Sequence, residues 1–539
     1  MDKKKRRYHL EIQTHGKNPY GIVRTSFWKN GKVCHETICR ITGLSLEELR
    51  IIQEGFRGNL VSKESYKVKN NREYGASYAC VELIKSLGLA KAIYSRQSEE
   101  WVRACMAMIA GRLVNAGSKL ALSHIGSQSA VWDICGIDAT DEGNIDVNVH
   151  CYAAMDNLLA RQDAIQKALA KKHLQDGTVI LYDITSCYVE GEYDNSDLVS
   201  FGYNRDQKRG HEQIVISLLC AKDGCPVAVD VFKGNTKDET TVLEKITELK
   251  DKFGLENVIF TGDRGMITKV NFEQIDHKTI KVISALKHAD IKELCKKGTI
   301  SLNQFDDKRI VEVIDEGKRY CLCKNPDMAK KETKTRNELL HQTRQELDKI
   351  ISCTRKCKYS KEIRVGNVIG KHNMGKFITF HGKGDDLTYT IDETKIEHEE
   401  SLDGCYIIYT DVSADDITAV ETVASYKSLM YVEQAFRNMK TVHLEIRPIF
   451  HKTDDRIRCH VFICALAYYV MWHMKQRLRP LMDSDGKGIH RKYTFDYIMN
   501  SLRCVRQETV DFNGVITTNY VPELNTEQSK IMKLLGVKI

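Results

Sequence analysis

The sequence predicts an α/β protein whose central sheet is interrupted by a long insertion. Between residues 176 and 270, three apolar strand-like runs, one helical segment and a fourth apolar strand follow one another. Strand character returns at residues 406–412, after a segment of mixed signals. This order of strands and helices is typical of a mixed sheet covered by helices. A β-plus-helical region precedes the sheet.

Length and composition restrict the class of protein. A chain of 539 residues exceeds the size of a single core, so several domains are expected. With 42% hydrophobic and 29% charged residues, it is globular rather than disordered. No apolar stretch follows the basic start, so no signal peptide is expected, and the 18 cysteines are predicted to be reduced thiols of a cytoplasmic protein.

Two regions are expected before the sheet. Residues 1–75 are predicted to form a small β-rich unit, because Asn30-Gly31 between two β-rich runs is a hairpin signal. Residues 76–175 are predicted to be helical, since apolar residues recur there at intervals of three and four. A helical domain at this place could bind DNA ends, although no helix-turn-helix pattern is present.

The sheet itself is expected in two parts. Residues 176–270 form the first part, with a turn at Asp223-Gly224 between two strands. Residues 404–480 form the second part, which contains a long helix through Lys440. Its apolar run is too short to span a bilayer and is expected to be a buried helix, so no membrane partner is predicted. Residues 481–539 form a tail with few signals.

Residues 271–403 are expected to be a β-rich insertion domain with a basic stretch. From Lys331 to Lys376 there are twelve Lys and Arg against five Asp and Glu, whereas the whole chain has a net charge of only +8. A confined basic patch is typical of a protein that binds a polyphosphate, so binding that weakens steeply with salt is predicted. The alternative interpretation is a solvated helix face.

Four cysteines of the insertion could form a zinc site. They are two close pairs, Cys321 with Cys323 and Cys353 with Cys357. The one-residue gap of the first pair is unusual for zinc ligands, which favours ordinary buried thiols.

Two aspartates follow apolar strand residues. Asp183 lies inside the run VILYDIT, where a buried carboxylate is costly unless it is compensated. Asp263 closes the run VIFTGD, at the carboxyl edge where α/β sheets carry their sites. Oxygen ligands of this kind suit Mg²⁺ or Mn²⁺. The alternative is two unrelated acids, since carboxylates after strands are common.

A third carboxylate lies on the long helix. At about 100° per residue, Glu433, Arg437 and Lys440 fall on one side of it, and Tyr426 lies on the same side. The apolar stripe that buries the helix consists of Val432, Ala435, Phe436 and Met439. A plain Glu433–Arg437 ion pair would explain two of these polar residues, but not the lysine or the tyrosine.

These residues, in this order, resemble the DDE transposases of the insertion-sequence-four superfamily. The resemblance covers at least residues 178–470. It is carried by the two strand aspartates and by a Tyr-x6-Glu-x6-Lys helix. FGYNRDQKRGHEQ, GCPVAVDVFKGNTKDETT and VEQAFRNMKTVHLEIRPIF also resemble sequences of that superfamily. Tyr426, Glu433 and Lys440 match its signature, whereas the arginine position holds Leu429.

The resemblance implies a ribonuclease-H-like core with a β-rich insertion between the second aspartate and the glutamate. It implies that Asp183, Asp263 and Glu433 bind two Mg²⁺ or Mn²⁺ ions. Tyr426 and Lys440 would contact DNA phosphates. Either Arg437 or Lys427 would replace the signature arginine.

The implied function is a bacterial insertion-sequence transposase that cleaves the ends of its element and joins the 3′ ends to target DNA. DNA is the implied partner, with a homodimer on DNA. The alternatives are a two-metal nuclease without strand transfer and a domesticated inactive DNA-binding protein. The insertion lacks tryptophan, so a flipped base of a hairpin intermediate would have to stack on another ring. The candidates are Tyr320, Tyr359, Phe377 and Phe380.

Overall fold

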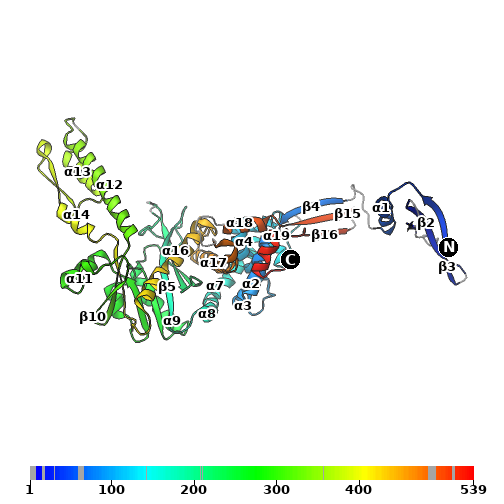
Figure 1. Cartoon of the computed structure of the whole chain (residues 1–539), viewed down its shortest axis with the longest axis horizontal. Coiled ribbons are helices and arrows are strands. Elements are labelled where there is room, and N and C mark those ends of the chain that lie inside the picture. The colour runs from blue at the N-terminus through cyan, green and yellow to red at the C-terminus, as the bar shows by residue number, and fades with distance from the viewer. Residues whose placement is uncertain are drawn as a thin grey trace. The chain divides into compact units, whose positions relative to one another are not determined.

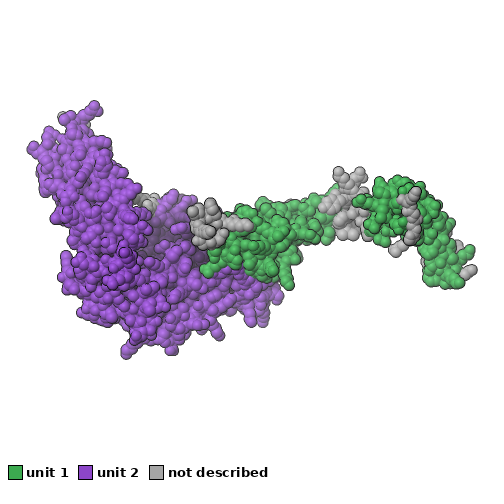
Figure 2. Space-filling model, viewed as in Figure 1, with its two compact units in different colours: residues 1–82, 123–145, 478–539 green, residues 83–122, 146–477 purple. Residues whose placement is uncertain are grey.

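The computed structural model divides the chain into two compact units. One consists of residues 1–82, 123–145 and 478–539, and the other of residues 83–122 and 146–477 (Figure 2). The described residues are 8–14, 18–29, 31–58, 66–140, 143–206, 208, 210–355, 357–483, 493–512 and 516–539.

The larger unit is built on an eight-stranded sheet of order β10-β11-β14-β9-β8-β5-β6-β7. Figure 1 labels β5 and β10 of this sheet. β8 pairs in parallel with β5 and β9, and the other pairs are antiparallel. The strands are β5 (Thr178–Tyr188), β6 (Gln213–Ala221), β7 (Pro226–Lys233), β8 (Val258–Gly262), β9 (Ile280–Ala285), β10 (Val311–Asp315), β11 (Lys318–Lys324) and β14 (Cys405–Thr410). The predicted mixed α/β sheet is confirmed.

Helices cover the sheet, which explains why its central strands are apolar without alternation. Every residue of β6 is buried. α15 (Ala419–Lys427) and α16 (Leu429–Arg437) pack on the strands, and α8 (Gln162–His173) packs on β7. The other helices of this region are α3 (Leu89–Ile93), α4 (Glu100–Val114), α5 (Lys119–Ser123), α7 (Ala154–Ala160), α9 (Asp238–Asp251), α10 (Lys269–Gln274) and α11 (His288–Lys297). The turn predicted between β6 and β7 is confirmed, because Gly224 has a φ of 85° and its N–H donates to the carbonyl of Ala221 at 2.9 Å.

α17 (Asp454–Met482) contains the longest apolar run. It is the one helix among the described residues that is long and apolar enough to cross a membrane, but 83% of its apolar window is buried inside the protein. That burial is what a core helix shows, as the sequence predicts.

The insertion differs from its prediction. β9, β10 and β11, which lie within residues 271–403, are strands of the main sheet. The segment between β11 and β14 is mainly helical, with α12 (Pro326–Ile351), α13 (Lys361–Lys371), α14 (Glu393–Glu400) and one hairpin of β12 (Ile378–His381) and β13 (Thr388–Ile391). The β-like runs were real strands, but periodicity alone does not say which sheet a strand joins.

The smaller unit combines both ends of the chain. β1 (Tyr8–Gln13), β2 (Tyr20–Lys29) and β3 (Lys32–Ile41) form one sheet with α1 (Leu46–Arg57) beside it. Lys29 pairs with Lys32, which confirms the hairpin, although Asn30 is outside the described residues. β4 (Tyr66–Glu73) pairs with β15 (Arg506–Phe512), and β15 pairs with β16 (Ile516–Tyr520).

The tail after residue 480 is therefore structured. It contains β15, β16, α18 (Phe495–Arg503) and α19 (Thr526–Leu535). Two further helices lie earlier in the chain, α2 (Gly75–Ser86) and α6 (Val131–Ile134). The expected boundaries at residues 75, 175 and 480 do not coincide with the compact units, because β4 takes its partner from the other end of the sequence.

Candidate active site

Neighbouring parallel strands bring the two aspartates to one region of the sheet. Tyr182 of β5 pairs with Gly262 of β8, so the residues that follow them, Asp183 and Asp263, are adjacent across the sheet. Asp183 is half-buried, whereas Asp263 lies just after the end of its strand and is exposed.

α16 adds the glutamate. Its buried face includes Val432 and Phe436 and packs on β5, while Glu433 stays exposed. Burial raises the pKa of Asp183 to about 7. The N–H of Ile184 at 2.8 Å opposes this shift, and the negative charges of Asp263 and Glu433 increase it. The structure therefore brings the three predicted carboxylates into one electrostatically coupled group.

The resemblance implies that Tyr426 contacts DNA phosphate, but in the structure Tyr426 binds one of the three carboxylates. Its hydroxyl donates to Oδ1 of Asp263 at 3.0 Å. Burial raises the pKa of Tyr426, as do the charges of Asp263 and Glu433, so the hydroxyl keeps its proton and acts as a donor. Tyr426 orients one carboxylate of the site.

The helix expected from Tyr426 to Lys440 is interrupted. α15 ends at Lys427, α16 begins at Leu429, and a π-helical turn follows at Asn438–Val442. A π turn advances by less than 100° per residue, so projecting an α-helix beyond Arg437 gives the wrong side. Lys440 is accordingly buried rather than presented beside Glu433.

Lys440 binds inside the protein. Its Nζ donates to Oγ1 of Thr185 at 2.7 Å and lies 3.2 Å from a carboxylate oxygen of Asp206. Arg447 pairs with the other oxygen of Asp206 at 3.0 Å. Burial lowers the pKa of Lys440, and Asp206 opposes that shift. The lysine thus ties the segment after α16 to β5, although it also lines a cavity of about 280 Å³ with Arg447.

The position of the missing arginine is part of the core. Leu429 is only 8% exposed, so an arginine there would have to bury its charge. Arg437 is exposed on α16, and its guanidinium makes no ion pair with Glu433 or with any other described residue. Lys427 instead lies 6.0 Å from the ring centre of Tyr406. Of the two candidate replacements, Arg437 is the one on the helix of Glu433.

Sequence reasoning missed a supporting pair beside the carboxylates. Arg205 donates to the carbonyl of Ile184 and to the carboxylate of Asp238, the first residue of α9. Burial raises the pKa of Asp238, Arg205 opposes this, and the charge of Asp263 adds to it. Arg205 and Asp238 lie in the two stretches that resemble transposase sequences, which was the available signal.

The donor set fits divalent metal ions. Asp183, Asp263 and Glu433 offer only hard carboxylate oxygens, the ligands that Mg²⁺ and Mn²⁺ prefer. These oxygens do not all lie within 4.8 Å of one another. Burial is the main cause of the raised pKa of Asp183, and the charges of Asp263 and Glu433 add to it, so a bound cation would favour the ionised carboxylate.

The four insertion cysteines do not come together. Cys321 and Cys323 are buried in β11, whereas Cys353 and Cys357 follow α12. The 26 residues of α12 span about 39 Å. The two cysteine pairs therefore cannot share one zinc ion, which was the less favoured interpretation of the sequence. The four rings considered for base stacking differ in exposure. Tyr320 and Phe377 are buried, while Tyr359 and Phe380 are 54% and 38% exposed.

The basic stretch is largely neutralised by the residues that follow it. Residues 377–403 contain eight Asp and Glu against two Lys. Four cations of the stretch pair with these acids: Arg336 with Asp403, Arg344 with Glu393, Lys361 with Asp385 and Lys376 with Glu399. Lys371 pairs with Glu346 of the stretch itself. Lys331, Lys349 and Arg355 make no ion pair with described residues. Counting charge in one sequence window therefore overstated the free positive charge.

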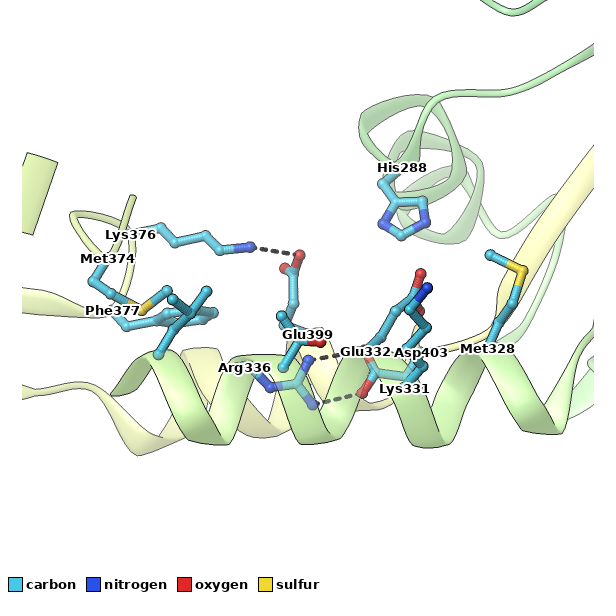
Figure 3. A pocket seen from close by; sticks show the side chains of 12 residues that line it. His288, Met328, Lys331, Glu332, Arg336, Met374, Lys376, Phe377, Glu399 and Asp403 are labelled. Atoms are coloured by element: carbon cyan, nitrogen blue, oxygen red, sulfur yellow. Dashed lines mark hydrogen bonds and ion pairs between the residues drawn. The ribbon is translucent and has the colours of Figure 1, made fainter. Parts of the chain in front are cut away.

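Figure 3 shows where two of these pairs lie. Arg336 and Asp403 form a two-pronged contact, with one bond of 2.8 Å, and Lys376 donates to Glu399 at 2.8 Å. They border a cavity of about 620 Å³ at the base of α12. Its apolar lining includes Met328, Met374 and Phe377.

Comparisons with known proteins identify one family. A cryo-EM structure of a piggyBac transposase synaptic complex with hairpin DNA matches with 10% sequence identity over 79% of this chain and 89% of that chain. Its TM-score is 0.28, too low to support an argument about this chain. No curated protein matches the sequence. The model of the transposase DDE domain matches residues 174–470, which is more than half of the chain and contains all three carboxylates. The chain therefore belongs to the family of transposase DDE domains.

Proposed function

We propose that this protein is an insertion-sequence transposase of the insertion-sequence-four type, which cleaves the ends of its element and joins the 3′ ends to target DNA. The observation that carries the proposal is geometric: the pairing of β5 with β8 places Asp183 beside Asp263, and α16, which carries Glu433, packs on β5. The match to the transposase DDE domain supports it.

In this proposal Asp183, Asp263 and Glu433 hold two Mg²⁺ or Mn²⁺ ions. When bound, such ions lower the pKa of the attacking water or 3′-hydroxyl and stabilise the leaving oxygen. Tyr426 holds Asp263 through its hydroxyl. Arg205 fixes the backbone of β5 beside Asp183 through the carbonyl of Ile184.

The DNA contacts are assigned to cations that remain accessible. Arg437 lies exposed on the helix of Glu433, and Lys349 and Arg355 lie at the far end of α12. Lys440 has a positioning role, because Asp206 and Thr185 hold its ammonium. The helices within residues 76–175 remain the candidate for binding the DNA ends, and a homodimer on DNA in the cytoplasm completes the proposal.

The experiment that tests the function uses the DNA that flanks the gene. Short inverted repeats there would define an end fragment, which is labelled and incubated with the protein, Mg²⁺ and a target plasmid. The proposal expects cleaved ends and a labelled joined product. Hydrolysis without joining would favour a two-metal nuclease of the same fold, and DNA binding without cleavage would favour an inactive DNA-binding protein.

The salt dependence of DNA binding tests the assigned cations. Replacing Lys349 or Arg355 by Gln should reduce the slope of log affinity against log salt by about 1 for each phosphate that the variant no longer binds. Lys371→Gln is the matched control, because Lys371 already pairs with Glu346 at 3.0 Å. Its slope should stay close to that of the unmodified protein. Equal slopes for all variants would show that these cations do not bind phosphate.

A further inference from the structure

A second group of metal-ligating side chains lies outside the carboxylate site. His173 ends α8, Cys225 lies in the turn before β7, and His473 lies within α17. One ligand atom from each lies within 4.8 Å of the other two. All three residues belong to the larger unit, and three elements distant in sequence converge there.

The side chains of this group are suited to a metal ion. Cys225 is fully buried, and Nε2 of His473 is buried without a hydrogen-bond partner. Burial lowers the pKa of His473 to about 3, and the neighbouring His173 and Lys172 lower it further. Burial also lowers the pKa of His173. A buried imidazole nitrogen without a hydrogen-bond partner is satisfied when it binds a metal ion.

We propose that His173, Cys225 and His473 bind one Zn²⁺ ion. A thiolate and two imidazoles select Zn²⁺ over Mg²⁺, and zinc commonly has three protein ligands with a fourth position for water or a carboxylate. The thiol of Cys225 loses its proton to solvent as the sulfur–zinc bond forms.

Neighbouring groups complete the site. Asp223 is exposed, and its Oδ1 accepts the N–H of Cys225 at 3.1 Å. The carboxylate of Asp223 is not among the ligand atoms that lie within 4.8 Å of one another, so water is expected in the fourth position of the ion. The hydroxyl of Tyr469 lies 3.0 Å from Nε2 of His173 and 3.4 Å from Nζ of Lys172. Outer contacts of this kind orient metal-binding histidines.

The site would brace the catalytic helix. The turn that holds Cys225 touches α16, because a Cβ built on Gly224 would lie 2.6 Å from Cβ of Tyr431. Tyr431 is two residues before Glu433. An ion bound to Cys225 would therefore fix α8, α17 and this turn together, next to the helix that presents a catalytic carboxylate.

Cobalt binding tests the proposal, because Co²⁺ replaces Zn²⁺ and gives a visible thiolate-to-metal absorption. The full-length protein is titrated with Co²⁺ in excess Mg²⁺, which occupies the carboxylate site. One Co²⁺ per chain with this absorption is expected. Cys225→Ser should abolish the absorption, and His473→Gln should weaken Co²⁺ binding by at least about 10-fold. Cys504→Ser, at an exposed thiol, should bind Co²⁺ like the unmodified protein.

Two further variants make the test decisive. Asp183→Asn should leave the absorption unchanged, because it alters only the carboxylate site. His173→Gln should weaken binding even if Cys225→Ser fails to fold, and circular dichroism establishes which variants are folded. Absence of the absorption from the unmodified protein, or its persistence in folded Cys225→Ser, would overturn the proposal.

Discussion

Asp183→Asn is expected to slow metal-dependent DNA cleavage by about a thousand-fold. A metal ion bound there stabilises the charge of the transition state by several kcal/mol. The same change should stabilise the metal-free protein at pH 8. Burial and two neighbouring carboxylates raise the pKa of Asp183 to about 7, so its ionised form is unfavourable in the folded state. Thermal unfolding with and without Mg²⁺ measures this second effect.

The pH dependence follows from the sign of that shift. When a carboxyl group has a higher pKa in the folded state than in the unfolded state, the free energy of unfolding falls as pH rises between the two values. For Asp183 this range is from about 4 to about 7. Asp183→Asn should remove this decline. Asp307→Asn is the control, since the side chain of Asp307 is exposed and forms no ion pair with a described residue. Full cleavage by Asp183→Asn would exclude the residue from the metal site.

Asp403→Asn is expected to destabilise the insertion by about 3 kcal/mol, since it leaves the guanidinium of Arg336 without its buried partner. Both side chains are only 8% exposed, and Arg336 spans both carboxylate oxygens. Burial alone would raise the pKa of Asp403, but the hydrogen bonds from Arg336 and Thr333 lower it overall. Urea unfolding followed at the insertion measures the loss.

This stabilisation has a defined pH window. A carboxyl group with a lowered pKa contributes its stability above its unfolded pKa of about 4 and loses it as pH falls through the folded value. The difference between Asp403→Asn and the unmodified protein should therefore shrink below about pH 4. Asp386→Asn, at an exposed carboxylate without an ion pair, should have little effect at any pH. An equal loss in both variants would show that the buried pair is not the cause.

The strands and the carboxylate group were predictable because their signals are local. Apolar runs, one around Asp183 and one ending in Asp263, marked two strands, and the helix motif marked Glu433. The mixed sheet was predicted for the same reason. Its outer strands β10 and β11 were not assigned to it, because pairing across more than eighty residues leaves no local signal.

The prediction failed where local geometry or distant charges override a regular pattern. Lys440 was placed beside Glu433 on an ideal helix, but the π turn after Arg437 moves it inward to Asp206. The basic stretch looked free because its acidic partners, such as Asp403, come later in the chain. His173, Cys225 and His473 are far apart in the sequence and form no recognisable metal-binding motif, because only the fold brings them together.

The most direct test of the central claim asks whether the carboxylates act as one unit. Cleavage rates of an end fragment with Mg²⁺ are compared for Asp183→Asn, Glu433→Gln and the double variant. Residues that hold shared metal ions are strongly non-additive, so the double variant should be about as slow as either single variant. A double variant whose loss is the product of the two single losses, or a single variant that cleaves at full rate, would contradict a shared metal site.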